Sequence, residues 1–170
     1  WVRSGTRLVD LAQRLSERGL AQEVLGASGQ QTLAGAISTG THGSGMAFGN
    51  MSTQVTALRM VCADGSVRNI SAASDKNLFD AARLSLGALG VITHVELQCV
   101  DAYRLHYRNS RDQLNGTLRK LDRLKREHRH FEFSWYPNND NVQLRFMDTT
   151  SEPLSPLSPQ RLARNLILDN

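Results

Sequence analysis

The stretch from Gln30 to Gly45 carries the residue types in this chain that are best suited to chemistry. It reads QQTLAGAISTGTHGSG and holds three threonines, two serines and four glycines. Glycines allow positive φ angles and a close approach of the backbone to a ligand, and successive N–H groups in such a loop form a concave donor site for an anion. Hydroxyl groups add donors without charge. The stretch therefore predicts a loop that holds a phosphorylated or dinucleotide-like ligand.

Other interpretations of this stretch fit less well. A plain surface loop has a similar composition, but apolar residues such as Leu33 and Ile37 indicate that part of the stretch is buried. No Gly-x-x-x-x-Gly-Lys-Ser/Thr pattern occurs, which argues against a P-loop nucleotide triphosphatase. No clear strand precedes Gly43, so the strand-turn-helix context of a Rossmann fingerprint is missing.

Hydrophobic periodicity predicts the elements that position this loop. Thr6 is expected to cap a helix that Gly19 ends, and Thr32 is expected to cap a short helix through Ile37. Between two strand-like runs, Asp64-Gly65 predicts a β-hairpin. The remaining elements before residue 100 are a helix capped by Ser74 or Asp75 and a half-buried strand over 93–99.

After Val100 the pattern changes, and we place a domain boundary near Asp101. The alternation of Tyr103, Leu105 and Tyr107 predicts a strand. The motif Ser-Arg-Asp-Gln at 110–113 predicts a capping box that opens a basic amphipathic helix. Two further strands and a turn are expected before a proline-containing segment, and one short helix is expected over 160–168.

The sequence from Gly26 to Cys99 resembles the flavin domain of the vanillyl-alcohol-oxidase-type FAD oxidoreductases. The resemblance is strongest to the aldonolactone oxidase branch, which comprises gulonolactone, arabinonolactone and alditol oxidases. It is carried, in this order and spacing, by QTLAGAISTGTHG at 31–43, QVTAL at 54–58, ADG at 63–65 and LGALGVIT at 86–93. It covers residues 1–100 well and residues 101–170 loosely.

The resemblance implies an α+β fold, in which residues 1–100 form the second half of a PCMH-type FAD-binding domain. Residues 101–170 would begin an α/β substrate-binding (cap) domain. The residues expected at the FAD are Ser28, Thr32, Gly35, Ser38, Thr41, His42, Gly43, Ser44, Val91 and Ile92. No catalytic residue can be assigned. The family's N-terminal phosphate loop and its C-terminal histidine- and tryptophan-containing motif have no counterpart here, so we expect the chain to be an internal fragment that binds FAD weakly alone.

The same resemblance implies an activity. A CH–OH group of a sugar lactone or polyol would pass a hydride to flavin N5, and oxygen or another acceptor would reoxidise the flavin. Two alternatives stay open: a related flavoenzyme with another substrate, such as a sugar nucleotide reductase, and a non-catalytic nucleotide-binding module that keeps the loop without flavin.

Composition excludes several other classes. The net charge is +4, but its excess lies on the solvated face of the basic helix, with no reading element or stacking aromatics for nucleic acid. The sequence His-Arg-His at 128–130 after that helix is expected to be solvated, and no metal site is expected. No signal peptide is visible in this sequence, and its longest apolar runs are too short to span a membrane. We therefore expect a cytoplasmic protein, with association to anionic membrane surfaces left open.

Overall fold

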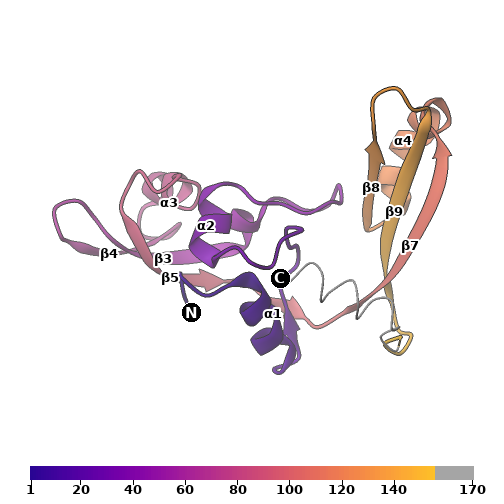
Figure 1. The fold of residues 1–170 in the computed structure, drawn as a ribbon. Helices are drawn as coiled ribbons and strands as arrows, with labels where there is room; N and C mark the ends of the chain where they lie inside the picture. Colours follow the sequence, from indigo (N-terminus) through magenta and orange to yellow (C-terminus); the bar gives the residue numbers. More distant parts are fainter. Residues whose placement is uncertain (156–170) are drawn as a thin grey trace.

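The computed structural model describes residues 1–155 and shows two units, each built from helices and an antiparallel sheet (Figure 1). The first unit contains β1 (Val2–Arg3), α1 (Leu8–Ser16), β2 (Leu20–Ala21), α2 (Leu33–Ser38), the 3₁₀ helix η1 (Met51–Gln54), β3 (Val55–Val61), β4 (Val67–Ser71), α3 (Lys76–Ala82), β5 (Val91–Leu97) and β6 (Val100–Asp101). The second contains β7 (Arg104–Gln113), α4 (Leu114–Glu127), β8 (His130–Trp135) and β9 (Asn141–Thr150). The predicted α+β class is confirmed. The helix expected over 160–168 lies outside the described residues, and the boundary near Asp101 stays a prediction.

The sheet of the first unit has the order β1-β5-β3-β4, with every neighbouring pair antiparallel. The hairpin predicted at Asp64-Gly65 is confirmed, because Val61 pairs with Val67 on either side of it and Gly65 has a φ of +79°. The apolar side chains of β3, β5, α1, α2 and α3 form one core that includes the fully buried Leu33, Ile37 and Leu58. Helix α2 is therefore fixed to the sheet through its buried face.

Helix α1 begins without the cap that the sequence predicts. Its N-cap residue is Arg7, no side chain caps it, and Thr6 lies outside the helix. The first N–H groups of the helix donate instead to a neighbouring segment, from Leu8 to the carbonyl of Gln31 and from Val9 to the carbonyl of Gly29. Backbone carbonyls thus satisfy the donors that a side chain was expected to satisfy.

The sheet of the second unit has the order β7-β9-β8, and α4 packs against it over a second apolar core. The capping box predicted at 110–113 is wrong, because these residues form the end of β7 and pair with 141–144 of β9. Helix α4 begins only at Leu114, whose N–H donates to the carbonyl of Asp140. A continuous ladder with β9 satisfies these backbone groups better than a local cap does.

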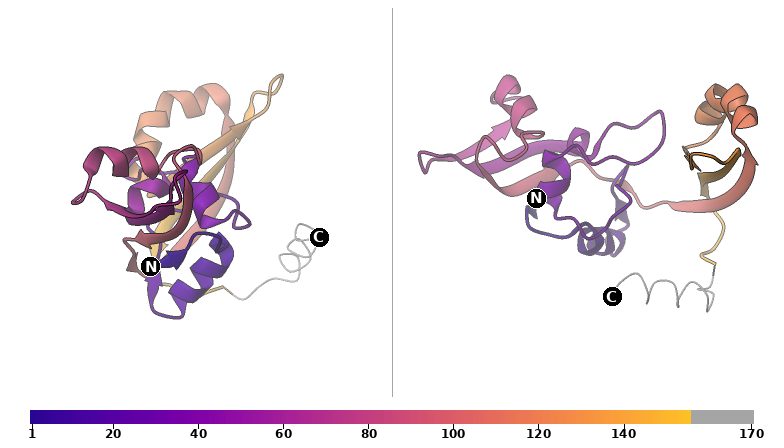
Figure 2. Two further views of the ribbon diagram at one scale, coloured as in Figure 1. Left: turned by 90° about the vertical axis from the view of Figure 1, so that its left-hand side faces the viewer. Right: turned by 45° about the horizontal axis from the view of Figure 1, so that its top comes forward.

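The two units meet at one end of the first sheet. The loop that follows α2 reaches toward β8, as two directions of view show (Figures 1 and 2). Strand β6 pairs with β2, and β7 then leads away into the second sheet. Within residues 1–155, no helix is long and apolar enough to cross a membrane.

Candidate functional site

The loop from Thr41 to Gly45, which we call the flavin loop, follows α2, and the N–H of Thr41 donates to the carbonyl of Ala36 in that helix at 2.9 Å. The carbonyl of Thr41 accepts from the N–H of Met51 at 2.8 Å. Its hydroxyl accepts from the side-chain amide of Gln31 at 3.1 Å. The loop is thereby fixed both to the residue that opens η1 and to the segment before α2.

One wall of the flavin loop is the backbone of residues 24–26. A Cβ atom on Gly43 would lie 2.5 Å from the carbonyl oxygen of Leu25 and 2.8 Å from Cγ2 of Val24. A Cβ atom on Gly26 would lie 2.4 Å from Cγ2 of Thr41. Only glycine allows this contact, because real Cβ atoms do not approach other heavy atoms so closely. The glycines thus serve the packing of two protein segments as well as any approach to a ligand.

The N–H groups of the flavin loop are available for a ligand. Among the described residues, the backbone N–H groups of the loop from His42 to Gly45, and those of Met46 and Ala47 directly after it, have no hydrogen-bond partner. The carbonyls of Gly43 and Ser44 are in contrast paired with imidazole nitrogens. A row of unpartnered donors suits an anion, and each N–H bond to a charged phosphate oxygen contributes roughly 1.5–3 kcal/mol. The loop therefore fits the pyrophosphate of FAD.

Three of the predicted residues, at the start and end of α2, are already hydrogen-bonded within the protein, unlike the N–H groups of the flavin loop. The Thr32 hydroxyl accepts from the N–H of Gly35 at 3.3 Å, which confirms the predicted cap. The N–H groups of Leu33 and Ala34 donate to carbonyls of the β1–α1 segment. The start of the helix therefore has few donors left for a ligand. Ser38 is buried, and its carbonyl accepts from the N–H of Leu86.

Removing this cap gives a first prediction. Thr32→Ala is expected to lower the free energy of unfolding by about 1 kcal/mol, the usual cost of losing a threonine cap. Thr32→Ser keeps the hydroxyl and is expected to match the original protein. Urea unfolding of both variants measures this difference, and equal losses in the two variants would mean that the cap is not what stabilises α2.

The two predicted residues of β5 lie away from the flavin loop. Val91 and Ile92 pair with Val61 and Met60 at the far end of β3, whereas the loop is anchored just before the start of that strand. A seven-residue strand spans roughly 20 Å. Val91 is 68% exposed and Ile92 is buried in the core. One contact site for both the loop and β5 would therefore have to extend along the sheet, as a dinucleotide can.

Ser28 lies in the exposed segment between β2 and α2, where its hydroxyl accepts from the N–H of Gln30 at 3.4 Å. Gly26, two residues before it, touches the flavin loop. The structure thus places Ser28 in the segment that lines the flavin loop, together with Thr41, His42, Gly43 and Ser44. The helix α2 with its cap, which contains Thr32, Gly35 and Ser38, directly precedes the flavin loop in the chain. The remaining two residues, Val91 and Ile92, lie at the other end of the sheet.

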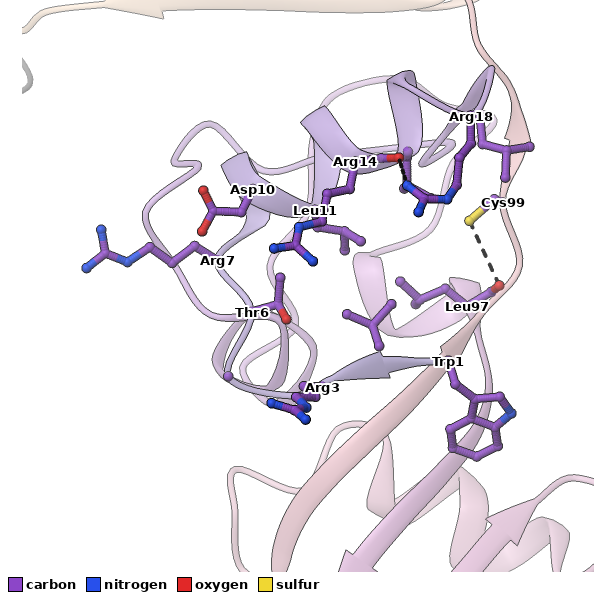
Figure 3. Close-up of a pocket in the computed structure, with 14 residues that line it drawn as sticks. Trp1, Arg3, Thr6, Arg7, Asp10, Leu11, Arg14, Arg18, Leu97 and Cys99 are labelled. Carbon is purple, nitrogen blue, oxygen red and sulfur yellow. Dashed lines mark hydrogen bonds between the residues drawn. The ribbon is translucent and has the colours of Figure 1, made fainter.

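One cavity of the molecule lies away from the flavin loop. A cavity of about 950 Å³ lies beneath α1 and contains none of the predicted flavin residues (Figure 3). Its lining includes the arginines at positions 3, 7, 14 and 18 and the side of Leu97 and Cys99. The cavity is open, and its arginines are exposed. It therefore does not take part in the site around the flavin loop.

Sequence reasoning missed the residues that contact the flavin loop from the second unit. The segment at 128–130, expected to be solvated, is instead packed between the units: His130 is only 6% exposed, and its Nδ1 lies 2.6 Å from the carbonyl oxygen of Ser44. His128 Nδ1 lies 2.7 Å from Oδ2 of Asp148. No local pattern distinguishes these histidines from the solvated end of a basic helix, so this expectation was wrong.

Asp148 is held in its charged form. Partial burial raises the pKa of this carboxyl group, but the N–H of Arg129, the hydrogen bond and charge of His128 and the charge of Arg108 together lower the pKa below its ordinary value. A carboxylate with a depressed folded-state pKa adds stability above its unfolded pKa, about 3.9, and loses that stability as the pH falls through its folded pKa. Because the side chain is 41% exposed, solvent screens much of this contribution.

A second prediction follows for acid unfolding. Asp148→Asn is expected to be less stable than the original protein at neutral pH, and the difference is expected to shrink as the pH falls below about 4. Urea unfolding at both pH values measures this. Asp140→Asn, a change in an exposed turn residue of the same unit, is the control. A stability difference for Asp148→Asn that does not change with pH would mean that the pKa of Asp148 is not lowered in the folded protein.

Comparisons with known proteins give the class of the first unit, which is that of the FAD-binding domains. Residues 1–71 match the family model described as FAD binding domain. A solved structure of cholesterol oxidase from Brevibacterium sterolicum superposes with a TM-score of 0.79 at 18% identity, over 92% of this chain and 32% of that chain. This likeness concerns the fold alone.

The family within that class comes from sequence relatives. Residues 95–170 match the family model of D-arabinono-1,4-lactone oxidase. L-gulonolactone oxidase of Mus musculus is 40% identical over 91% of this chain and 35% of its own length. L-gulono-1,4-lactone dehydrogenase of Mycobacterium tuberculosis (strain ATCC 25618 / H37Rv) is 39% identical over 91% and 36%, and D-arabinono-1,4-lactone oxidase of Yarrowia lipolytica is 34% identical over 93% and 30%. The chain belongs to the aldonolactone oxidase branch of the FAD-linked oxidoreductases, and it spans about a third of the length of these relatives.

Proposed function

We propose that this protein binds FAD and oxidises a CH–OH group of a sugar lactone. The observation that carries the proposal is the row of four unpartnered N–H groups in the flavin loop. It lies in a chain whose sequence relatives are named as lactone oxidases and a lactone dehydrogenase. When bound, FAD would supply the hydride acceptor at flavin N5.

The residues of this chain would bind and orient the cofactor. Donors of Thr41, His42, Gly43 and Ser44 would hold phosphate oxygens by backbone and hydroxyl groups, without a lysine. Ser28 would add a hydroxyl from the neighbouring segment. The remaining predicted contacts stay predictions: Thr32, Gly35 and Ser38 on α2, and the backbone of Val91 and Ile92 on β5.

The complete protein, expressed from its full reading frame, tests the proposal. We expect a flavin absorption spectrum and loss of that absorption when L-gulono-1,4-lactone or D-arabinono-1,4-lactone is added without oxygen. A polyol such as sorbitol serves as the comparison substrate for the alditol oxidase alternative. A folded protein that gains no flavin spectrum on addition of FAD would refute the enzyme hypothesis and favour the nucleotide-binding module.

The electron acceptor is part of the same proposal. We propose oxygen, because oxidases stand among the relatives, with a second acceptor as the alternative because a relative named as a dehydrogenase stands beside them. Oxygen uptake and dye reduction, measured side by side with the same lactone, separate the two. Turnover that occurs with dye alone would assign the protein to the dehydrogenases.

A further inference from the structure

The flavin loop is bonded to the second unit as well as to its own. The Ser44 carbonyl can only accept, so the contact with Nδ1 of His130 at 2.6 Å requires that this nitrogen carry hydrogen. Just beyond the loop, the ring of Phe48 stacks on the imidazole of His130, with centroids 5.1 Å apart and planes inclined by 23°. His130 therefore contacts this part of the chain twice, through its edge and through its face.

Arg129 makes a second set of contacts at the same junction. Its guanidinium carbon lies 4.5 Å from the ring centroid of Phe48 and 4.6 Å from that of Tyr103, so the charged group is contacted by two aromatic rings. Its carbonyl oxygen would lie 2.4 Å from a Cβ atom on Gly45, so the backbones touch there. Nη2 donates to the carbonyl of Glu23 at 3.4 Å.

The junction also holds the segment at 24–26, which packs against the flavin loop. The Tyr103 hydroxyl lies 3.1 Å from the carbonyl of Gln22 and 3.0 Å from that of Glu23. Glu23 leads directly into Val24 and Leu25, the residues against which Gly43 packs. Tyr103, just before β7, and Arg129 and His130 of the second unit therefore hold both the loop and the segment that lines it.

We propose that Arg129 and His130 are positioning residues that keep the flavin loop in its donor conformation, so that the second unit contributes to flavin affinity. The inference rests on the proposed function. Without His130 the Ser44 carbonyl loses its partner, and the neighbouring peptide N–H groups are free to turn away from the ligand. Without the Arg129 guanidinium, Phe48 and Tyr103 lose the cation between them. The flavin loop and the segment at 24–26 then separate.

The test uses the complete protein and the variants Arg129→Met and His130→Ala. The readouts are the flavin retained per protein after gel filtration and the Kd of the apoprotein for FAD from fluorescence quenching. We expect each variant to weaken FAD binding by at least about tenfold, which is the loss expected when one hydrogen bond to a charged phosphate oxygen is no longer made. His130→Asn, which restores a donor near the position of Nδ1, is expected to recover part of the affinity.

Matched controls separate positioning from folding. Arg126→Met removes an arginine at the end of α4 whose side chain makes no hydrogen bond or ion pair within residues 1–155, and this variant is expected to bind FAD normally. If Arg129→Met does not fold, Phe48→Leu tests the same junction, because it keeps an apolar side chain but removes the ring that Arg129 and His130 contact. It is likewise expected to weaken FAD binding. If the original protein binds FAD and the variants bind it equally well, this inference is overturned and the proposed function is not. Failure of the original protein to bind FAD would overturn the proposed function instead.

Discussion

Gly43→Ala is expected to remove most of the flavin affinity of the complete protein. The new methyl group would lie 2.5 Å from the carbonyl oxygen of Leu25, which is a backbone atom that cannot rotate away. The flavin loop must therefore move off the 24–26 segment, and its unpartnered N–H groups move with it. We expect FAD to bind at least about tenfold more weakly, since one lost charged hydrogen bond already accounts for that much.

The same substitution is expected to lower the free energy of unfolding by about 1–3 kcal/mol, the usual cost of overpacking. Gly5→Ala is the matched control, because a Cβ atom at Gly5 meets nothing within 4 Å. Fluorescence titration of the apoproteins with FAD and urea unfolding measure the two effects. Normal affinity in Gly43→Ala would mean that the flavin loop does not bind the cofactor.

Local features of this chain could be predicted from its sequence. Asp75 accepts from the N–H of Leu78 and starts α3, Thr32 starts α2, and Asp64-Gly65 turns the hairpin. Each of these depends on residues within a few positions of one another, so one short segment contains the whole physical cause. The alternation of Phe131, Phe133 and Trp135 likewise predicts the strand β8 from its own sequence.

Features that depend on distant partners could not be predicted. Thr6 has a good capping side chain, but carbonyls from residues 29–31 already satisfy the start of α1. Ser110 is drawn into β7 because a strand more than thirty residues later offers a full ladder. The burial of His130 depends on a loop 86 residues away. In each case a long-range contact decides the outcome, and nothing in the local pattern reports it.

The glycines of the candidate site show the same limit. The sequence predicts that they leave room for a ligand, and the available N–H groups support that hypothesis. It could not show that Gly26 and Gly43 also allow two segments of protein backbone to touch. The cradle is therefore preformed by contacts inside the protein, and this preformation is what makes a single added methyl group so damaging at Gly43.

Gly90→Ala is expected to have the largest effect on stability. Gly90 has a φ of +141°, a conformation that side chains rarely adopt, and its Cβ atom would lie 2.4 Å from the carbonyl oxygen of Val61. The unfavourable backbone costs about 1–3 kcal/mol, and the overpacking costs about 1–3 kcal/mol more. Because Val91 pairs with Val61 directly after this contact, the start of β5 is expected to leave the sheet.

Gly87→Ala separates these two costs. Gly87 also has a positive φ, +79°, but a Cβ atom there meets nothing within 4 Å. We expect Gly87→Ala to lower the free energy of unfolding only by the cost of the unfavourable backbone conformation. Gly90→Ala is therefore expected to be less stable than Gly87→Ala by the cost of overpacking. Urea unfolding of the complete protein measures both. If the two variants were equally stable, the contact between Gly90 and Val61 would not constrain β5, and the proposed role of Val91 and Ile92 at the flavin would lose its structural support.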